Sequence, residues 1–491
     1  MDSSAVLHIA TLHGGGVDRH VRDIVRGLAR PQLVWHAGPG AEVVELPREG
    51  RSYPLDEAAL EREADSLAAW LRVRGVGLLH THSLTRAARA RAASIAGRLG
   101  APTIVTLHDI LFLRSDALEP GAGGAPDAAW LAQTSDFLRA AAAVVAPSGY
   151  VADLARRHVP GLDVQVVPNG SPPPYADAGT IDPRPEFAGR RPRAVAAVLG
   201  AIGPHKGSAV LAQMEPFLAG TGIAIVVIGY LDAQVTAGWR GEHLFVHGPY
   251  RDEDVPGLLR AYGVRIGLFP NRVPESFSYA LSDLWDAGIP VLVPDDGALA
   301  ERVRRHGGGW VLTPGAGARE IAATLAARLD PGNAQSLARV ESDLARSDDA
   351  RVPRLDAMTR SLDALYARFG IDATPPVDVE APAIQALLSK NLDGALFRVE
   401  LARIADEFVQ LKQGLEGERA QSAKFAAEAR AWIAKLDGDV AKLQAELARE
   451  VEARRAFAEE NARLRDSAAA LDLLPRLLRR ILLKKIRDAR G

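Results

Sequence analysis

Two acidic residues within one short segment offer the clearest chemistry in this sequence. Glu275 and Asp283 are separated by seven residues within the segment 274–290, PESFSYALSDLWDAGIP. The pattern predicts a helix whose first turn, at residues 276–279, presents free backbone N–H groups and the positive end of the helix dipole. We therefore expect a phosphate there, with the two carboxylates accepting hydroxyl groups of a sugar and a ribose on either side. The alternative is a dipole-stabilising Glu275 and a solvated Asp283.

A lysine and a tyrosine extend this interpretation. Lys206 ends the segment 197–206, AVLGAIGPHK, after a glycine turn and at the start of a predicted helix, where an ammonium group would neutralise a diphosphate. Tyr250 follows the apolar run 244–248 and is placed to stack on a base. An exposed lysine after a turn and a packed loop tyrosine are the alternatives.

Glycines follow the first apolar run of the chain. Residues 12–16, LHGGG, precede a helical pattern, and Gly15 and Gly16 allow the backbone to approach a phosphate or a sugar closely. The triplet lacks the GxGxxG spacing, so a nicotinamide cofactor is less favoured. A simple tight turn is the alternative.

Three histidines lie near the ends of two further apolar runs. His80 and His82 share one face of a predicted strand, as a metal pair would, but no third ligand follows at a suggestive spacing. We expect polar contacts there and no metal. His108 follows the run 103–107 and is expected to face a cleft between two domains, although a buried, satisfied histidine is the alternative.

Composition limits the classes of function. The chain has 491 residues, 47% of them hydrophobic, and a net charge of -2, so it can form two ordinary cores and nucleic acid is not an expected partner. It contains no cysteine, which excludes disulfides, thiolate metal sites and a cysteine nucleophile. The N-terminus lacks a signal-peptide pattern and no apolar stretch is long enough for a membrane helix, so we expect a cytoplasmic protein.

Short apolar runs alternate with helical patterns in two series. This alternation predicts an α/β protein with two doubly wound domains, residues 1–172 and 190–370, each with a parallel sheet covered by helices on both faces. Ligands of such sheets bind beyond the carboxyl ends of the strands. The expected strands are 6–11, 32–37, 77–82, 103–109, 144–148 and 164–169, then 194–200, 223–229, 244–248, 266–270 and 290–294.

Over residues 6–369 the chain resembles the retaining glycosyltransferases of family four, which have the GT-B architecture of two Rossmann-like domains. The resemblance rests on five motifs taken together. They are Gly14-Gly15-Gly16, Thr106-Leu107-His108-Asp109, Pro168-Asn169-Gly170, the segment 200–207 with Lys206, and the Glu275–Asp283 pair.

The resemblance implies a role for each predicted site residue. Glu275 would bind the donor sugar with His108 beside the anomeric carbon, Asp283 would bind the ribose, and Tyr250 would stack on the base. The donor diphosphate would be held by Gly15, Gly16, Lys206, Ser276, Phe277 and Ser278. The family transfers a sugar from a nucleotide-sugar donor with retention, without an essential metal and without another cofactor.

Two positions depart from the family pattern. Ala201 stands where the family usually has an arginine, which removes one expected cation from the diphosphate, and His205 is a partial substitute. Asp283 replaces the usual glutamate and is one methylene shorter.

The rest of the chain differs in composition from the two domains. After a linker at 371–383, residues 384–470 show heptad-like apolar spacing that predicts a helical coiled coil and a homo-oligomer. The alternative is a lone helix that packs on the enzyme. Residues 475–491, PRLLRRILLKKIRDARG, predict a basic amphipathic helix for the inner face of the cytoplasmic membrane, or for an acidic partner.

These features favour a sugar transferase that acts on a saccharide acceptor. Attachment of the tail to a membrane would make a lipid-linked acceptor natural, as in bacterial cell-surface polysaccharide (O-antigen or capsule type) biosynthesis. Two alternatives stay open: another GT-B enzyme, such as a nucleotide-sugar epimerase or a phosphorylase, and a catalytically weak scaffold that acts through its coiled coil.

Overall fold

The computed structural model describes residues 5–10, 15–38, 41–55, 60, 64–115, 126–173, 181–232, 237–346 and 351–369, with Lys442, Ala445, Arg449 and Glu452 in helical conformation. The predicted linker, the basic tail and all but these four positions of the predicted coiled coil lie outside the described residues. All elements named below belong to one compact unit, Met1–Glu416.

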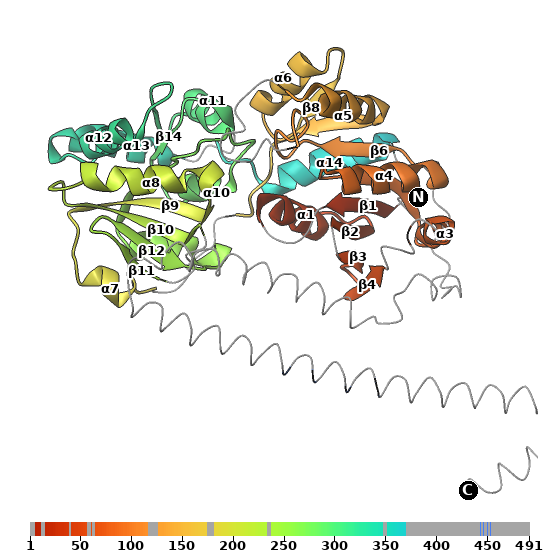
Figure 1. The fold of residues 1–491 in the computed structure, drawn as a ribbon, viewed down its shortest axis with the longest axis horizontal. Coiled ribbons are helices and arrows are strands. Elements are labelled where there is room, and N and C mark those ends of the chain that lie inside the picture. The colour runs from red at the N-terminus through yellow and green to blue at the C-terminus, as the bar shows by residue number, and fades with distance from the viewer. Residues whose placement is uncertain are drawn as a thin grey trace, which may run out of the picture. The chain divides into compact units, whose positions relative to one another are not determined.

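The first domain is built on an eight-stranded sheet with helices on both faces (Figure 1). Its central strands are parallel, whereas β3 and β4 extend one edge as an antiparallel meander. The strands, in spatial order, are β4 (Arg51–Leu55), β3 (Ala41–Leu46), β2 (Gln32–Gly38), β1 (Ala5–Ala10), β5 (Val76–Thr81), β6 (Thr103–Thr106), β7 (Ala143–Ala146) and β8 (Val164–Val166). The helices are α1 (Gly15–Gly27), α3 (Ala64–Val73), α4 (Arg86–Leu99), α5 (Ala128–Ala140) and α6 (Gly149–His158).

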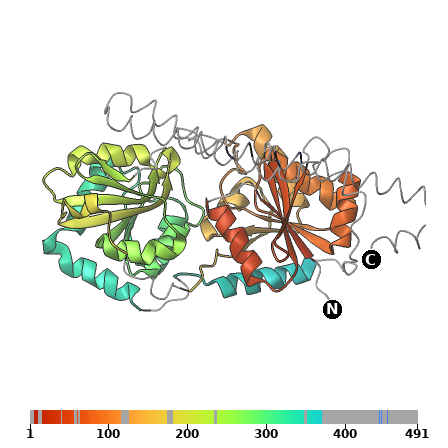
Figure 2. The same cartoon turned by 90° about the horizontal axis from the view of Figure 1, so that it is seen from below.

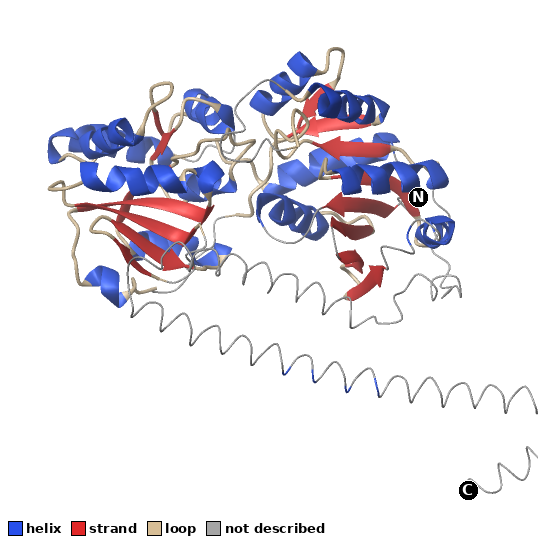
Figure 3. Cartoon of the chain, in the orientation of Figure 1, coloured by secondary structure: helices blue, strands red, loops and turns tan. Residues whose placement is uncertain are grey.

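The second domain repeats this plan around a seven-stranded sheet (Figure 3). The strands, in spatial order, are β11 (Gly238–Arg240), β12 (Leu244–Gly248), β10 (Ile223–Leu231), β9 (Ala194–Ile202), β13 (Val264–Leu268), β14 (Val291–Val293) and β15 (Gly309–Val311). The helices are α7 (Pro185–Ala188), α8 (Ser208–Met214), α9 (Val255–Ala261), α10 (Tyr279–Asp286), α11 (Gly297–His306), α12 (Ala318–Arg328) and α13 (Ala334–Leu344).

The apolar runs of the sequence become the central strands because both faces of each sheet are covered. Every residue of β1 and of β5 is buried, and β10 is buried except at Tyr230. Strands of this kind read as continuous apolar runs rather than as alternating patterns. The prediction of two doubly wound domains is therefore confirmed.

The chain crosses between the two domains twice. It leaves the first domain after Ser171 and returns at Arg354, where the two residues form a parallel β-bridge. The last described helix, α14 (Leu355–Phe369), then packs beside α1 of the first domain (Figure 2). Its Asp363 accepts a hydrogen bond from Arg30 at 2.9 Å, which fastens the returning helix to the first domain.

Four strands were not predicted, and the expectation of purely parallel sheets was wrong at two edges. The strands β3, β4 and β11 pair antiparallel to their neighbours, and β15 adds a short parallel edge. The sequence of β3, AEVVEL, places glutamates among apolar residues, so no uninterrupted apolar run marks this strand. The other three lie at sheet edges, where one side of a strand is unpaired and less apolar character is needed.

Candidate functional site

One cavity of about 580 Å³ collects residues from both domains, beyond the carboxyl ends of their central strands. It lies where open α/β sheets bind their ligands. Its lining includes all ten residues singled out from the sequence: Gly15, Gly16, His108, Lys206, Tyr250, Glu275, Ser276, Phe277, Ser278 and Asp283. The fold thus brings together segments that are up to 268 positions apart in the chain, since the lining runs from Gly15 to Asp283.

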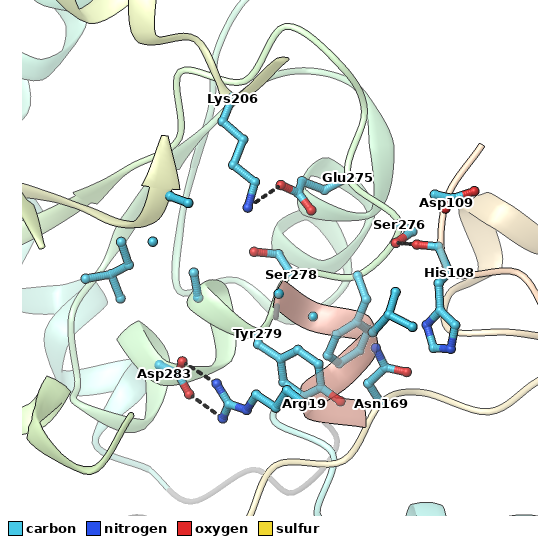
Figure 4. A pocket seen from close by; sticks show the side chains of 18 of the residues that line it. Arg19, His108, Asp109, Asn169, Lys206, Glu275, Ser276, Ser278, Tyr279 and Asp283 are labelled. Atoms are coloured by element: carbon cyan, nitrogen blue, oxygen red, sulfur yellow. Dashed lines mark hydrogen bonds and ion pairs between the residues drawn. The ribbon is translucent and has the colours of Figure 1, made fainter. Parts of the chain in front are cut away.

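Lys206 reaches the cavity from a single 3-10 turn, Pro204–Lys206, that follows β9. The next residue, Gly207, has φ 85°, and a Cβ added there would lie 2.0 Å from the carbonyl oxygen of Pro270. Only glycine fits this close approach of two backbones, which sets where the chain turns after Lys206. The ammonium group points toward Glu275 of the neighbouring loop (Figure 4).

Glu275 lies between two nitrogen groups at the cavity wall. Its Oε1 atom is 3.7 Å from Nζ of Lys206 and accepts a hydrogen bond from Nδ2 of Asn271 at 2.9 Å. Gly297, at φ 78°, packs against the Glu275 backbone, and the amide of Ala298 donates to the Glu275 carbonyl at 2.8 Å. The carboxylate is therefore held in place by its side-chain partners and by its own backbone.

The helix α10 begins at Tyr279, three residues later than the sequence suggested. Ser278 is the N-cap residue, with a positive φ of 72°, and its hydroxyl accepts from the amide of Leu281 at 3.4 Å. A positive φ is uncommon for a residue with a side chain, so the turn must be held by its surroundings.

A buried arginine of α11 holds this turn. Arg302 donates to the carbonyls of Phe277 and Ser278 at 3.1 and 3.0 Å, and to the Ser282 hydroxyl at 2.9 Å. Its guanidinium lies 4.2 Å from the centre of the Phe277 ring, which is itself buried. Burial lowers the pKa of Arg302 to about 9. Because the Phe277 side chain packs in the core, only its backbone is free to contact a ligand.

His108 and Asp109 form the part of the wall that follows β6. The backbone carbonyl of His108 accepts a hydrogen bond from the Ser276 hydroxyl, which joins the two domains beside the cavity (Figure 4). Burial lowers the pKa of His108 to about 3, so the imidazole is neutral at pH 7. Burial raises the pKa of Asp109 to about 6, although the Leu111 amide donates to its carboxylate at 2.8 Å and acts in the opposite direction.

Asp283 already has a partner in the opposite domain. Arg19 of α1 donates two hydrogen bonds to its carboxylate, at 2.9 and 3.0 Å, and its guanidinium lies 4.4 Å from the centre of the Tyr279 ring. Burial raises the pKa of Asp283, whereas the charge and hydrogen bonds of Arg19 favour the ionised form. A ribose that binds to Asp283 must therefore displace or share this arginine.

The remaining predicted residues complete the cavity wall. Tyr250 follows β12, and burial raises the pKa of its hydroxyl. Gly15 begins α1 with φ 74°, and a Cβ added at Gly16 would lie 3.7 Å from the Tyr279 ring. The start of α1 thus lies close to the start of α10.

A cluster of histidines lies beneath the first-domain side of the cavity. Two groups of three histidines each have one ring nitrogen per residue within 4.8 Å of one another. The first group is His8, His80 and His82, and the second is His20, His82 and His108. The sequence pattern revealed only the pair His80 and His82. Both nitrogens of His82 are engaged, with His8 at 2.9 Å and with His108 at 3.1 Å. Hydrogen bonds thus account for the histidine common to both sets, while the absence of a metal stays a prediction.

The first domain matches a known family. Residues 14–173 match the family model described as Glycosyltransferase Family 4. The first domain is therefore similar to the domains of this family. The match ends before Lys206 and Glu275, so it covers the half of the cavity that contains Gly15, Gly16 and His108.

Solved structures extend the likeness to both domains. HepE from Anabaena, in complex with UDP and glucose, has a TM-score of 0.54 at 16% identity and covers 74% of this chain and 100% of its own. Sucrose-phosphate synthase from Thermosynechococcus elongatus has a TM-score of 0.57 at 14% identity, over 74% of this chain and 98% of its own. A glycosyltransferase from Rickettsia africae has a TM-score of 0.52 at 14% identity, over 75% and 99%.

These likenesses show a two-domain GT-B fold, and the family match covers its first domain. No curated protein sequence matches the chain. Among the described helices, none combines the length and apolar character that crossing a bilayer requires.

Three residues of the site were missed by the sequence reasoning. Arg19 contacts Asp283, which lies 264 positions further along the chain, and Arg302 contacts Ser278, which lies 24 positions before it. The sequence around the two arginines does not indicate either contact. Asp109 was noted only as part of the motif 106–109. Its position directly after an apolar run was the available signal for a cavity-facing carboxylate.

Proposed function

We propose that this protein is a retaining glycosyltransferase that moves a sugar from a nucleotide-sugar donor to a saccharide acceptor, without an essential metal. A lipid-linked acceptor and a role in bacterial cell-surface polysaccharide (O-antigen or capsule type) biosynthesis are part of the proposal. HepE, which has the same fold, is described in complex with UDP-glucose, and this supports a nucleotide-sugar donor here.

One observation carries the proposal: Lys206 and Glu275 face each other across 3.7 Å in the same cavity as the amides that precede α10. A cation and free N–H groups suit a diphosphate, whereas a carboxylate suits sugar hydroxyls. Glycosyl transfer needs both, because the sugar becomes positively charged while the diphosphate departs.

The roles of the other residues follow from where they lie. Gly15 and Gly16 offer backbone close to the start of α10, and His108 lines the wall beside Ser276. In the proposed reaction the acceptor hydroxyl attacks the anomeric carbon from the face that the diphosphate leaves. The leaving group takes the bonding electrons and accepts the proton of the acceptor hydroxyl. Fixed groups around the diphosphate stabilise the transition state without reorganising.

Turnover of sugar nucleotides tests the proposal. Release of nucleoside diphosphate is measured for a panel of donors, with and without a lipid-linked saccharide, and NMR of the product shows whether the anomeric configuration is retained. Glu275→Ala and Lys206→Ala should each reduce kcat/KM by about a hundredfold or more, because each removes a charge at the reacting centre. Glu341→Ala, a partly exposed carboxylate of α13 that pairs with Arg265, is the control. Full activity in both cavity variants would refute the site.

Chelation tests the metal-independent mechanism. Dialysis against EDTA should leave the rate unchanged, since Lys206 and backbone amides replace a metal at the diphosphate in the proposed site. Loss of activity that zinc restores would instead assign a metal to the histidine cluster, which has two sets of three imidazoles.

A catalytically weak scaffold is the second candidate, and Ala201 favours it. This residue lines the cavity at a position where an arginine would have added a cation for the diphosphate. Arg19 and Arg22 bring positive charge to the cavity from the opposite domain. Nucleotide binding without turnover of any donor would support the scaffold over the transferase.

A further inference from the structure

A chain of hydrogen bonds crosses four neighbouring strands of the first sheet and ends at the cavity. Gln32 opens β2, His8 lies in β1, and His82 and His108 follow β5 and β6, which is the spatial order β2-β1-β5-β6. Consecutive members are 3.0, 2.9 and 3.1 Å apart: Gln32 Oε1 to His8 Nε2, His8 Nδ1 to His82 Nε2, and His82 Nδ1 to His108 Nε2.

The amide of Gln32 has only one orientation that satisfies its neighbours. Its Nε2 group faces two backbone carbonyls, those of Val25 and Leu28, at 3.4 and 3.5 Å. Turning the amide over would place its oxygen against these two acceptors. The side chain is buried, so water does not relieve such a contact. The oxygen of Gln32 therefore faces His8.

We propose that Gln32, acting through His8 and His82, is a positioning residue that fixes the tautomer of His108 and leaves its Nδ1 atom as a hydrogen-bond acceptor at the donor site. An oxygen that can only accept requires a proton on Nε2 of His8. A neutral imidazole has one N–H, so Nδ1 of His8 accepts from Nε2 of His82. By the same reasoning Nδ1 of His82 accepts from Nε2 of His108. Nδ1 of His108 is then unprotonated and carries a lone pair.

The rings of His8, His82 and His108 are neutral at pH 7. Burial lowers the pKa of His8 to about 4 and that of His108 to about 3, and it lowers the pKa of His82 well below its usual value. The neighbouring histidines stand outside the chain of bonds. His80 pairs with the hydroxyls of Tyr366 and Thr106, and His20 has no hydrogen-bond partner in the described part of the structure.

This inference rests on the proposed function for its consequence. A hydroxyl group of the donor sugar donates to Nδ1 of His108. In the other tautomer Nδ1–H would donate to the hydroxyl oxygen, and the hydroxyl proton would need another acceptor. The chain of hydrogen bonds thereby fixes His108 as the acceptor in this contact. Sites that hydrogen-bond a substrate hydroxyl discriminate strongly against sugars that lack it.

NMR of the full-length protein labelled with 15N-histidine tests the tautomer directly. Correlation of the ring nitrogens with the ring carbon-bound protons should show Nε2 of His108 protonated and Nδ1 unprotonated. The spectrum of His108→Asn assigns the signal by its loss. A protonated Nδ1 in the unaltered protein would overturn the proposal, and this measurement needs no substituted Gln32.

Two substitutions at Gln32 test the cause. Gln32→Leu removes the acceptor and should convert the His108 signal to a mixture of tautomers. It should also lower kcat by about tenfold, with the affinity for UDP unchanged, because His108 acts on the sugar. Gln32→Glu is protonated in this buried site, so its carbonyl oxygen faces His8 and its hydroxyl can donate to the carbonyls of Val25 and Leu28. It should therefore keep the tautomer, and kcat should stay within about twofold of that of the unaltered protein. An unchanged tautomer of His108 in Gln32→Leu would show that Gln32 does not fix it.

The two proposals fail separately. The spectrum is recorded without a donor, so an inactive protein with the expected tautomer would refute the transferase and leave the chain of hydrogen bonds supported. An active protein whose His108 carries its proton on Nδ1 would refute the chain of hydrogen bonds and leave the transferase supported.

Discussion

At the scale of the residue, the cavity contains one carboxyl group that titrates close to neutral pH. Burial raises the pKa of Asp109 from 3.8 to about 6, and the side chain lies on the same cavity wall as His108. A carboxyl group with a raised pKa binds a proton more readily in the folded protein. It therefore stabilises the fold below about pH 4, and this contribution is lost as the pH rises through 6.

The same titration predicts a pH dependence of donor binding. Protonation of Asp109 removes a negative charge from the cavity in which we propose that a diphosphate binds. A sugar nucleotide should therefore bind about two- to fivefold more tightly at pH 5.5 than at pH 7.5. A sugar nucleotide serves as the probe because its diphosphate does not titrate in this range. Calorimetry at both values measures the change.

Asp109→Asn is the matched variant for this prediction. It has no charge to titrate, so the affinity should be similar at both pH values. Two other groups of the cavity have shifted pKa values: burial raises that of Asp283, and burial and Lys206 lower that of His205. A pH dependence that persists in Asp109→Asn would assign the effect to Asp283, to His205 or to another group.

A site residue can be predicted from the sequence when its position depends on the residues next to it in the chain. Glu275, Lys206 and His108 each follow an apolar run or a turn, so their place at a strand end can be read from the neighbouring residues. Arg19 and Arg302 cannot be found in this way. Their partners, Asp283 and the carbonyls of 277–278, are set by how two elements pack, and no periodicity encodes that contact.

At the scale of the element, the start of α10 depends on α11. The sequence predicted the helix but placed its first turn too early, because a positive φ at Ser278 is not encoded by residue type. Tertiary contacts with Arg302 supply what the local sequence does not. The strands β3, β4 and β11 were missed for a similar reason, since their pairing partners rather than their composition make them strands.

Replacement of Arg302 by alanine should destabilise this turn and weaken donor binding. The change leaves the carbonyls of Phe277 and Ser278 without their donor, and it empties space beside a buried ring. We expect the free energy of unfolding to fall by about 3–5 kcal/mol and KM for the donor to rise about tenfold. Thermal unfolding followed by circular dichroism and steady-state kinetics measure the two effects.

Arg304→Ala provides the control on the same helix. Arg304 has an exposed side chain that pairs with Asp295 at the surface, so its loss should change stability by less than about 1 kcal/mol. Equal effects of the two substitutions on KM would show that Arg302 does not position the turn.

At the scale of the whole molecule, the basic tail predicts where the protein acts. Residues 475–491 lie outside the described structure, but their sequence carries both the cations and the apolar residues of an interfacial helix. The full chain should float with vesicles that contain anionic lipid at low salt, and a chain that ends at residue 474 should not. Equal flotation of both chains would show that residues 475–491 do not bind the membrane.

The contact between Arg19 and Asp283 spans the two domains and predicts a competition with the donor. The guanidinium occupies both carboxylate oxygens that a ribose would use. A protein whose competent form is only partly populated binds its ligand with proportionally lower affinity. Arg19→Gln should therefore tighten the binding of UDP by about three- to tenfold, as measured by calorimetry.

A double-mutant cycle separates this competition from a simple loss of charge. Arg22→Gln removes a neighbouring cation that pairs with Asp18 of its own helix, and it should weaken UDP binding slightly. In an Asp283→Asn background, Arg19→Gln should no longer tighten binding, because the pair that it disrupts is already lost. If Arg19→Gln instead weakens binding more than Arg22→Gln does, Arg19 contacts the diphosphate and compensates for Ala201. The cycle thus decides whether the two domains meet in a state that excludes the donor or in one that is ready to receive it.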